Sequence, residues 1–108
     1  MTNPDEATPV AVGGGVGEAI SRDGSVHVSV STAGAMPDYI VTLGPAVRFR
    51  SSDELAEQIR VVADIAFERA LAEMRADIEA RGGKSTAIGT GWRTHAEVDT
   101  YEKERLFF

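Results

Sequence analysis

The sequence predicts a small α+β domain in which an antiparallel β-meander of about three strands precedes one long α-helix. Its 108 residues, of which 43% are hydrophobic and 26% charged, suit one domain with a single core. Apolar and polar side chains alternate in short runs over residues 16–43, which is the spacing of half-buried strands. Residues 52–81 contain neither proline nor glycine, which favours an uninterrupted helix.

The chain divides into four predicted segments: a flexible tail over 1–15, a folded domain over 16–81, a Gly-rich linker over 82–91 and a C-terminal helical arm over 92–108. The tail contains two of the four prolines and ends in glycines, so it has too little apolar surface to offset the entropy of ordering. The glycine clusters at 13–17 and 89–91 lack the strand-then-helix context of dinucleotide-binding loops, and we interpret them as linkers.

Three strands account for the alternating region. Residues 16–20 have period-2 spacing, and Asp23-Gly24 then favours a tight hairpin turn. Residues 25–32 place three valines on one face and polar residues on the other, as in a half-buried antiparallel strand. Residues 39–43 are rich in β-branched and aromatic side chains, which predicts the third strand. Residues 47–49 predict a brief extended segment that adds two apolar side chains to the core.

The long helix is predicted to begin after Ser51, with Glu54 at capping-box spacing, and to end at Gly82-Gly83. One apolar stripe of this helix should face the sheet: Leu55, Ile59, Val62, Ala66 and Ala70. A second stripe lies about a quarter-turn away: Phe67, Leu71, Met74 and Ile78. A three-strand sheet is only ~15 Å wide and the helix ~40 Å long. The second stripe should therefore overhang the sheet and contact a partner, unless the C-terminal arm covers it.

The C-terminal arm repeats the capping-box spacing at Thr94 and Glu97 and carries several apolar anchors. Its acidic character and aromatic end are typical of a segment that docks. We therefore expect these residues to bind a protein partner, giving a homo- or hetero-dimer: Phe67, Leu71, Met74, Ile78, Trp92, Tyr101, Phe107 and Phe108.

Composition excludes several kinds of chemistry. The chain has no cysteine, so disulfides, Cys-ligated metals and thiol catalysis are excluded, and a reducing cytoplasm is the expected location. The first residues are not expected to form a signal peptide, and no apolar run approaches the ~20 residues of a membrane span. The net charge of −6 disfavours binding to nucleic acid or to an anionic membrane.

No motif indicates catalysis, a metal or a cofactor, so we expect none of the three. Residues 82–85 resemble the end of a phosphate-binding loop, but the leading glycine is replaced by Ile78 and the segment follows a helix. His95 and Asp99 offer only two metal ligands. The serines around His27 lack a suitably ordered acid and a nucleophile elbow, so a polar strand face is the favoured interpretation.

Three charged residues stand out from the solvated helix faces. Arg48 and Arg50 could hold a phosphate, although pairing with Asp53 and Glu54 is the favoured interpretation. Asp64 lies between apolar residues on both sides and is predicted to make a structural hydrogen bond or an interface contact.

Residues 29–32, Ser-Val-Ser-Thr, and the run 55–70 resemble the EspD/EspH-like proteins, a mycobacterial family associated with ESX (type VII) secretion. The segment Val62-Ala63-Asp64-Ile65-Ala66 is the most specific part, and the resemblance covers about residues 25–80. That family is in turn similar to the YbaB nucleoid proteins, in which a β-meander precedes a long helix. The resemblance thus implies a YbaB-like fold.

The resemblance implies a non-enzymatic accessory or chaperone-like protein that binds ESX secretion substrates, itself or both. Secreted ESX proteins resemble one another in a Tyr-x-x-x-Asp/Glu signal, whereas Tyr101 is followed by Arg105 and Tyr39 by Leu43. A cytosolic helper is therefore expected rather than a cargo protein. The alternative is a YbaB-like DNA-binding nucleoid protein, although residues 1–15 cannot supply the helix with which YbaB proteins begin.

Overall fold

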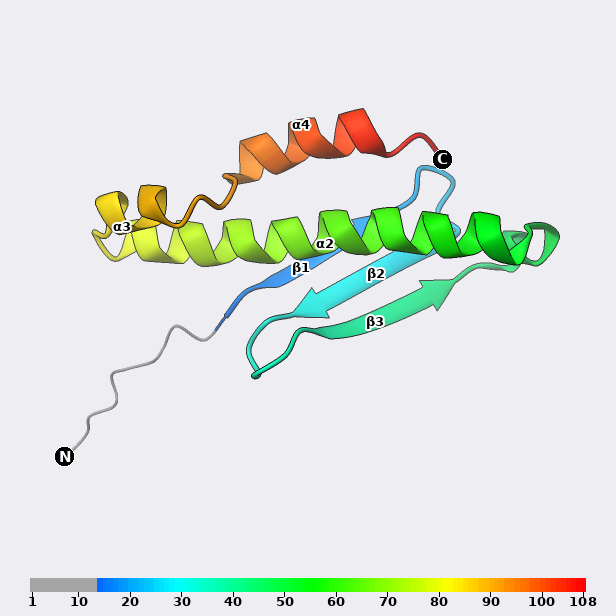
Figure 1. The fold of residues 1–108 in the computed structure, drawn as a ribbon, viewed down its shortest axis with the longest axis horizontal. Helices are drawn as coiled ribbons and strands as arrows, with labels where there is room; N and C mark the ends of the chain where they lie inside the picture. Colours follow the sequence, from blue (N-terminus) through cyan, green and yellow to red (C-terminus); the bar gives the residue numbers. More distant parts are fainter. Residues whose placement is uncertain (1–13) are drawn as a thin grey trace.

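The computed structural model describes residues 14–108, and most of the predicted tail lies outside this range. Its elements follow in the order β1 (Val16–Ile20), β2 (Val26–Ser31), β3 (Asp38–Leu43), the 3-10 helix η1 (Pro45–Phe49), α2 (Ser52–Ala80), α3 (Lys84–Gly89) and α4 (His95–Arg105). The predicted fold class, a three-strand antiparallel meander before one long helix, is confirmed (Figure 1).

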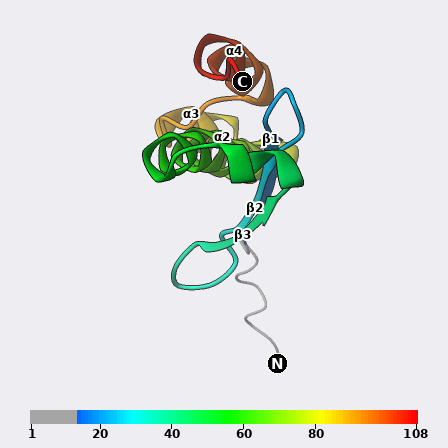
Figure 2. The same ribbon diagram turned by 90° about the vertical axis from the view of Figure 1, so that its right-hand side faces the viewer.

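The sheet has the order β1-β2-β3, and α2 packs on β1 and β2. Val26, Val28 and Val30 point from β2 towards α2 and are fully or almost fully buried, as the alternation predicted. Figure 2 shows α2 against one face of the sheet, with α4 and β3 on opposite sides of α2. Because one helix spans only about two strands, this placement leaves β3 without a covering layer.

The contact between β1 and α2 depends on small residues. A Cβ atom at Gly15 would lie 2.1 Å from the Ala70 carbonyl oxygen, and one at Gly17 would lie 2.0 Å from the Ala66 carbonyl oxygen. Gly15, Gly17 and Ala19 are buried, whereas Val16 is 62% exposed. The interpretation of the glycine cluster as a linker, and of residue 15 as part of the tail, is therefore wrong. Gly15 and Gly17 lack a Cβ atom, which allows the β1 and α2 backbones to touch.

The helix ends follow the sequence signals. Ser51 caps α2 by accepting a hydrogen bond from the Glu54 backbone N–H, and Gly82 has the positive φ of 86° expected at a helix stop. Thr94 and Glu97 form both bonds of the predicted capping box at the start of α4. The predicted linker is partly helical, however, because its residues form α3, which packs on α2.

The C-terminal arm docks on its own domain. Val98 and Leu106 are buried in the core cluster, on the side of α2 that presents Val61 and Ile65. The predicted structural hydrogen bond at Asp64 is confirmed, because the Tyr101 hydroxyl donates to its carboxylate. The arm thus covers a third apolar side of α2, which the two-stripe analysis of the helix did not identify.

The β1–β2 turn is held by a polar network rather than by apolar contacts. The Asp23 carboxylate accepts hydrogen bonds from the Ser25 backbone N–H, the Ser25 hydroxyl and the Ser21 hydroxyl. Arg50 completes it by pairing with Asp23 at 2.5 Å and by donating to Gln58 at 2.8 Å. The expected pairing of Arg50 with Asp53 and Glu54 is therefore wrong.

The segment after β3 also differs from the prediction, because residues 45–49 form a single 3-10 turn and not an extended strand. Val47 reaches the core, but Phe49 is 85% exposed, since side chains in a turn do not alternate between two faces.

The close contact between β1 and α2 predicts a large effect for Gly17→Ala. The new methyl group would overlap the α2 backbone, so we expect a loss of about 1–3 kcal/mol or more and a melting temperature lower by at least ~5 °C. Gly89→Ala is the matched control, because a Cβ atom there meets nothing within 4 Å and should leave stability unchanged or slightly raised. Equal melting temperatures for the two variants would contradict the proposed packing.

Hydrogen bonds from Ser25 and Ser21, with help from Arg50, hold the pKa of Asp23 far below its usual value of 3.8. A depressed carboxyl pKa contributes stability above the unfolded pKa, and this contribution is lost as the pH falls through the folded pKa. We therefore expect Asp23→Asn to melt earlier than the parent chain at pH ~7, with the difference shrinking below pH ~4. Asp38→Asn serves as an exposed control, and a pH-independent difference for Asp23→Asn would contradict the network.

Candidate protein-binding surface

The main uncovered apolar surface lies on β3. Its register pairs Tyr39 with Val30, Val41 with Val28 and Leu43 with Val26, so these three β3 side chains share the face of the sheet that carries the core. Yet Tyr39, Val41 and Leu43 are 45%, 43% and 42% exposed, because α2 does not extend over them. We call these three residues the β3 face.

The predicted partner residues of α2 lie on the side of the helix away from α4. Phe67 is a quarter-turn from Ala66, which faces β1, in the direction opposite to the α4-facing Ile65. Met74 accepts a hydrogen bond at Sδ from the Thr32 hydroxyl at 3.3 Å, which places it at the end of β2. We call Phe67, Leu71, Met74 and Ile78 the α2 stripe, and all four are half-buried.

The structure brings three predicted partner residues together at the far end of α2. Met74, Ile78 and Trp92 line a pocket of about 80 Å³ with Gly14 and Asp77. Trp92 is held there by its carbonyl oxygen, which accepts a hydrogen bond of 2.6 Å from Arg75. The indole of Trp92 thus extends the α2 stripe at its C-terminal end.

The remaining predicted partner residues are separated from this surface. Tyr101 belongs to α4 and points towards α2, with the guanidinium groups of Arg93 and Arg105 at 4.1 and 4.8 Å from its ring centre. Its hydrogen bond to Asp64 is the largest cause of a raised phenol pKa. Phe108 packs against the core, whereas Phe107 is 73% exposed. Tyr101 and Phe108 are thus engaged within the chain, and Phe107 is free to make contacts.

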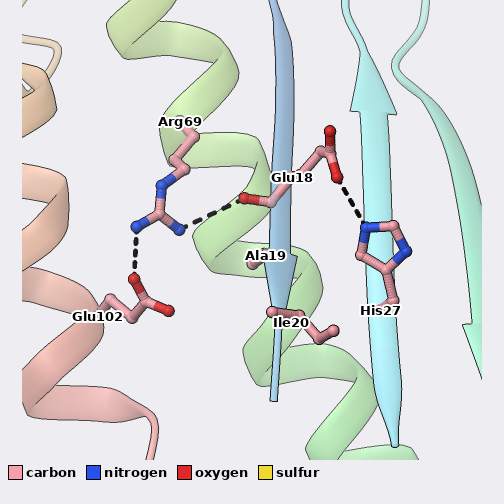
Figure 3. Close-up of a pocket in the computed structure, with 6 residues that line it drawn as sticks. All are labelled: Glu18, Ala19, Ile20, His27, Arg69 and Glu102. Carbon is pink, nitrogen blue, oxygen red and sulfur yellow. Dashed lines mark hydrogen bonds and ion pairs between the residues drawn. The ribbon is translucent and has the colours of Figure 1, made fainter. Parts of the chain in front are cut away.

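A cleft of about 320 Å³ lies on the opposite side of the molecule, between β1 and α4 (Figure 3). Arg69 donates to the Glu18 carbonyl oxygen at 3.4 Å and pairs with Glu102 and Asp99 of α4. The Glu18 side chain turns to the other side and lies 2.8 Å from His27 Nε2. Burial by itself would lower the pKa of Arg69, but its bonds to Glu102 and Asp99 raise it above its usual value.

These pairings occupy the charged groups of the cleft within the chain and give the cleft a structural role. Its arginine and both its glutamates are already hydrogen-bonded to groups of the chain itself, so the cleft joins α4 to β1. The cleft could not be predicted from the sequence, because Arg69 has the same spacing as the solvated arginines of the helix. The β3 face was likewise missed as a binding surface, although the unbroken apolar run Tyr39-Ile40-Val41 was visible in the sequence.

Neither a cluster of metal ligands nor a membrane-spanning helix is found among residues 14–108. Within residues 14–108, no cluster of three or more His, Cys, Asp or Glu side chains could hold a metal ion. None of the helices in that range is long and apolar enough to cross a membrane. Comparisons with protein-family models, curated proteins and solved structures gave no match. The surfaces and the sequence of the chain are therefore the basis for inferring its function.

Proposed function

We propose that the chain is a non-enzymatic protein-binding domain that acts as an accessory or chaperone-like protein in type VII (ESX) secretion. The observation that supports protein binding is the apolar surface formed by the exposed β3 face and the half-buried α2 stripe. Because large side chains at 42–45% exposure lie beside a closed core, covering them would bury apolar area without rearranging the fold.

The composition of this surface supports a protein as the ligand. Interface cores are enriched in aromatic residues and methionine and depleted in charge. The β3 face and the α2 stripe contain Tyr39, Phe67 and Met74 and no charged residue. A partner segment with one apolar side, such as an amphipathic helix, would match the elongated α2 stripe.

The resemblance to the EspD/EspH-like family supports the assignment to type VII secretion. The most specific part of that resemblance, residues 62–66, builds the core here, since Val62, Ile65 and Ala66 are fully buried. Asp64 in the same run anchors the C-terminal arm through Tyr101. The residues that resemble the family thus belong to the core of the fold, which supports the sheet and its β3 face. We propose the accessory role on the basis of this resemblance.

The distribution of charge favours a protein over DNA. A duplex is bound by cations that are free to neutralise phosphates. Carboxylates of the chain itself pair with these arginines: Arg50, Arg60, Arg69, Arg75, Arg81, Arg93 and Arg105. With a net charge of −6, the chain has little cationic surface left for phosphates.

Leu71→Asp tests the proposed surface. An aspartate in the α2 stripe would have to be desolvated on binding, so we expect at least ~10-fold weaker binding of a type VII secretion substrate. The far-UV circular dichroism should stay near that of the parent chain, because Leu71 is outside the buried core cluster. The measurement is calorimetric titration with type VII substrate proteins, purified one at a time.

Two further variants control this test. Ile20→Asp introduces the same charge at a 50% exposed position of β1 and should leave substrate binding unchanged. Val28→Ala truncates a fully buried side chain and should lower the free energy of unfolding by ~1–5 kcal/mol. If Leu71→Asp destabilises the domain as much as Val28→Ala does, the α2 stripe is part of the core and not a binding surface.

The same charge distribution predicts the absence of tight DNA binding. We expect no specific duplex binding in a gel shift at ~150 mM salt, because binding that depends on phosphate contacts weakens steeply as salt rises. Binding to a secretion substrate through the β3 face should change little between low and moderate salt, because apolar burial is not screened. Submicromolar duplex affinity at ~150 mM salt would favour the nucleoid-protein alternative.

A further inference from the structure

The two edges of the sheet are treated differently by the rest of the chain. At the β1 edge, Arg69 donates to the Glu18 carbonyl oxygen and the C-terminal carbonyl of Phe108 accepts a hydrogen bond from Arg22. At the other edge, no segment among residues 14–108 pairs with β3, and all six β3 residues are exposed. The outer edge of β3 therefore offers its backbone N–H and C=O groups to another strand.

β3 also lacks the features that usually protect such an edge. Proteins protect free edges with lysines, prolines, bulges or inward-pointing charges. The six residues from Asp38 to Leu43 include no lysine, arginine, proline or glycine, and their single charge is at the first position. Pro37 and Pro45 flank the strand without interrupting it. An unprotected apolar edge of this kind either aggregates or pairs specifically.

We propose that the outer edge of β3 pairs with β3 of a second copy of the chain, in antiparallel orientation, to form a continuous six-stranded sheet. The inference rests on the proposed function in taking β3 as a binding strand, but it uses the edge of the strand and not its face. The outer edge of β3 is thus a second binding surface, and its partner is another copy of the chain.

The side-chain alternation selects the register of this pairing. A two-fold axis at Val41 pairs Val41 with its own copy and Tyr39 with Leu43, so apolar residues meet on the α2 side of the sheet. The same register places Pro37 opposite Pro45, both outside the ladder, where a missing N–H does no harm. An axis at Ile40 would instead place Pro37 opposite Leu43 inside the ladder.

Charge and area set the strength of the dimer. The Val41-centred register separates the two Asp38 carboxylates by six residues, or ~20 Å, which exceeds the ~8 Å screening length at physiological salt. A stable interface buries about 800 Å² per partner, an eighth of the 6371 Å² surface of this chain. A strand ~20 Å long buries less than that. The dimer should therefore be reversible, forming at high micromolar concentration and dissociating on dilution.

The pairing leaves the proposed substrate surface open. Each α2 lies over β1 and β2 of its own copy, so the two helices would be about four strand spacings apart, or ~19 Å. Packed helices are 8–10 Å apart, so the two α2 helices would not touch. Both β3 faces would then lie side by side on the floor between them.

Disulfide trapping tests the pairing, because the chain has no cysteine of its own. Val41→Cys places two thiols directly opposite each other, ~5 Å apart between Cβ atoms, and should give a covalent dimer on oxidation. Tyr39→Cys alone should not, since its copies are ~13 Å apart, but a mixture of Tyr39→Cys and Leu43→Cys should cross-link. Ile20→Cys on β1 is the control for random collision and should give no covalent dimer on oxidation.

Failure of Val41→Cys and of the mixture to cross-link, with native circular dichroism, would overturn the pairing, as would equal cross-linking of all variants. Cross-linking through Leu71→Cys but not Val41→Cys would show that copies meet at the α2 stripe, which would also overturn it. Thr42→Lys separates the two proposals: it should weaken the dimer ~10-fold by light scattering and leave substrate binding unchanged. Leu71→Asp should do the reverse.

Discussion

The rest of the structure depends on the contact between the β1 backbone and the α2 backbone. Gly15 and Gly17 let the helix approach so closely that a single methyl group at either position would overlap a carbonyl oxygen of α2. This contact fixes α2 over β1 and β2, and the position of every other layer follows from it. The buried core consists mostly of valines and alanines, with Ile65 and Leu106 as its larger members.

Placing α2 at one side of the sheet divides the helix surface among different neighbours. The sheet covers Ala66 and Ala70, and the C-terminal arm lies against the side of α2 that carries Asp64, Glu68 and Arg69. The side that remains is the α2 stripe, beside a strand that no helix covers. The same packing that makes the core compact thus leaves apolar surface at β3. Exposed apolar side chains elsewhere, such as Phe49 and Ile88, lie on short turns and helices, whereas the β3 face is a continuous part of the sheet.

Much of this arrangement could be predicted from the sequence, because local signals decide it. Alternation specified β2, β-branched and aromatic composition specified β3, and the Ser51 cap and Gly82 stop specified α2 to within a residue. The errors concern long-range contacts. Gly15 and Gly17 were interpreted as linker residues because glycine carries no pattern that distinguishes a loop from a close backbone approach. The docking of Tyr101 on Asp64 joins residues 37 positions apart, and no local pattern identifies such a pair. It could be predicted only as a hydrogen bond or interface contact at Asp64, with no partner named.

The position of β3 also has a consequence for how binding and stability are coupled. β3 is held mainly by its ladder with β2, since α2 packs on the other two strands. Elements with few buried apolar contacts open locally at lower free energy than the core. A substrate on the β3 face or a second copy at the β3 edge would therefore stabilise the least stable strand of the sheet. Binding of either one would then increase the affinity for the other, because the first to bind already supplies the free energy needed to order β3.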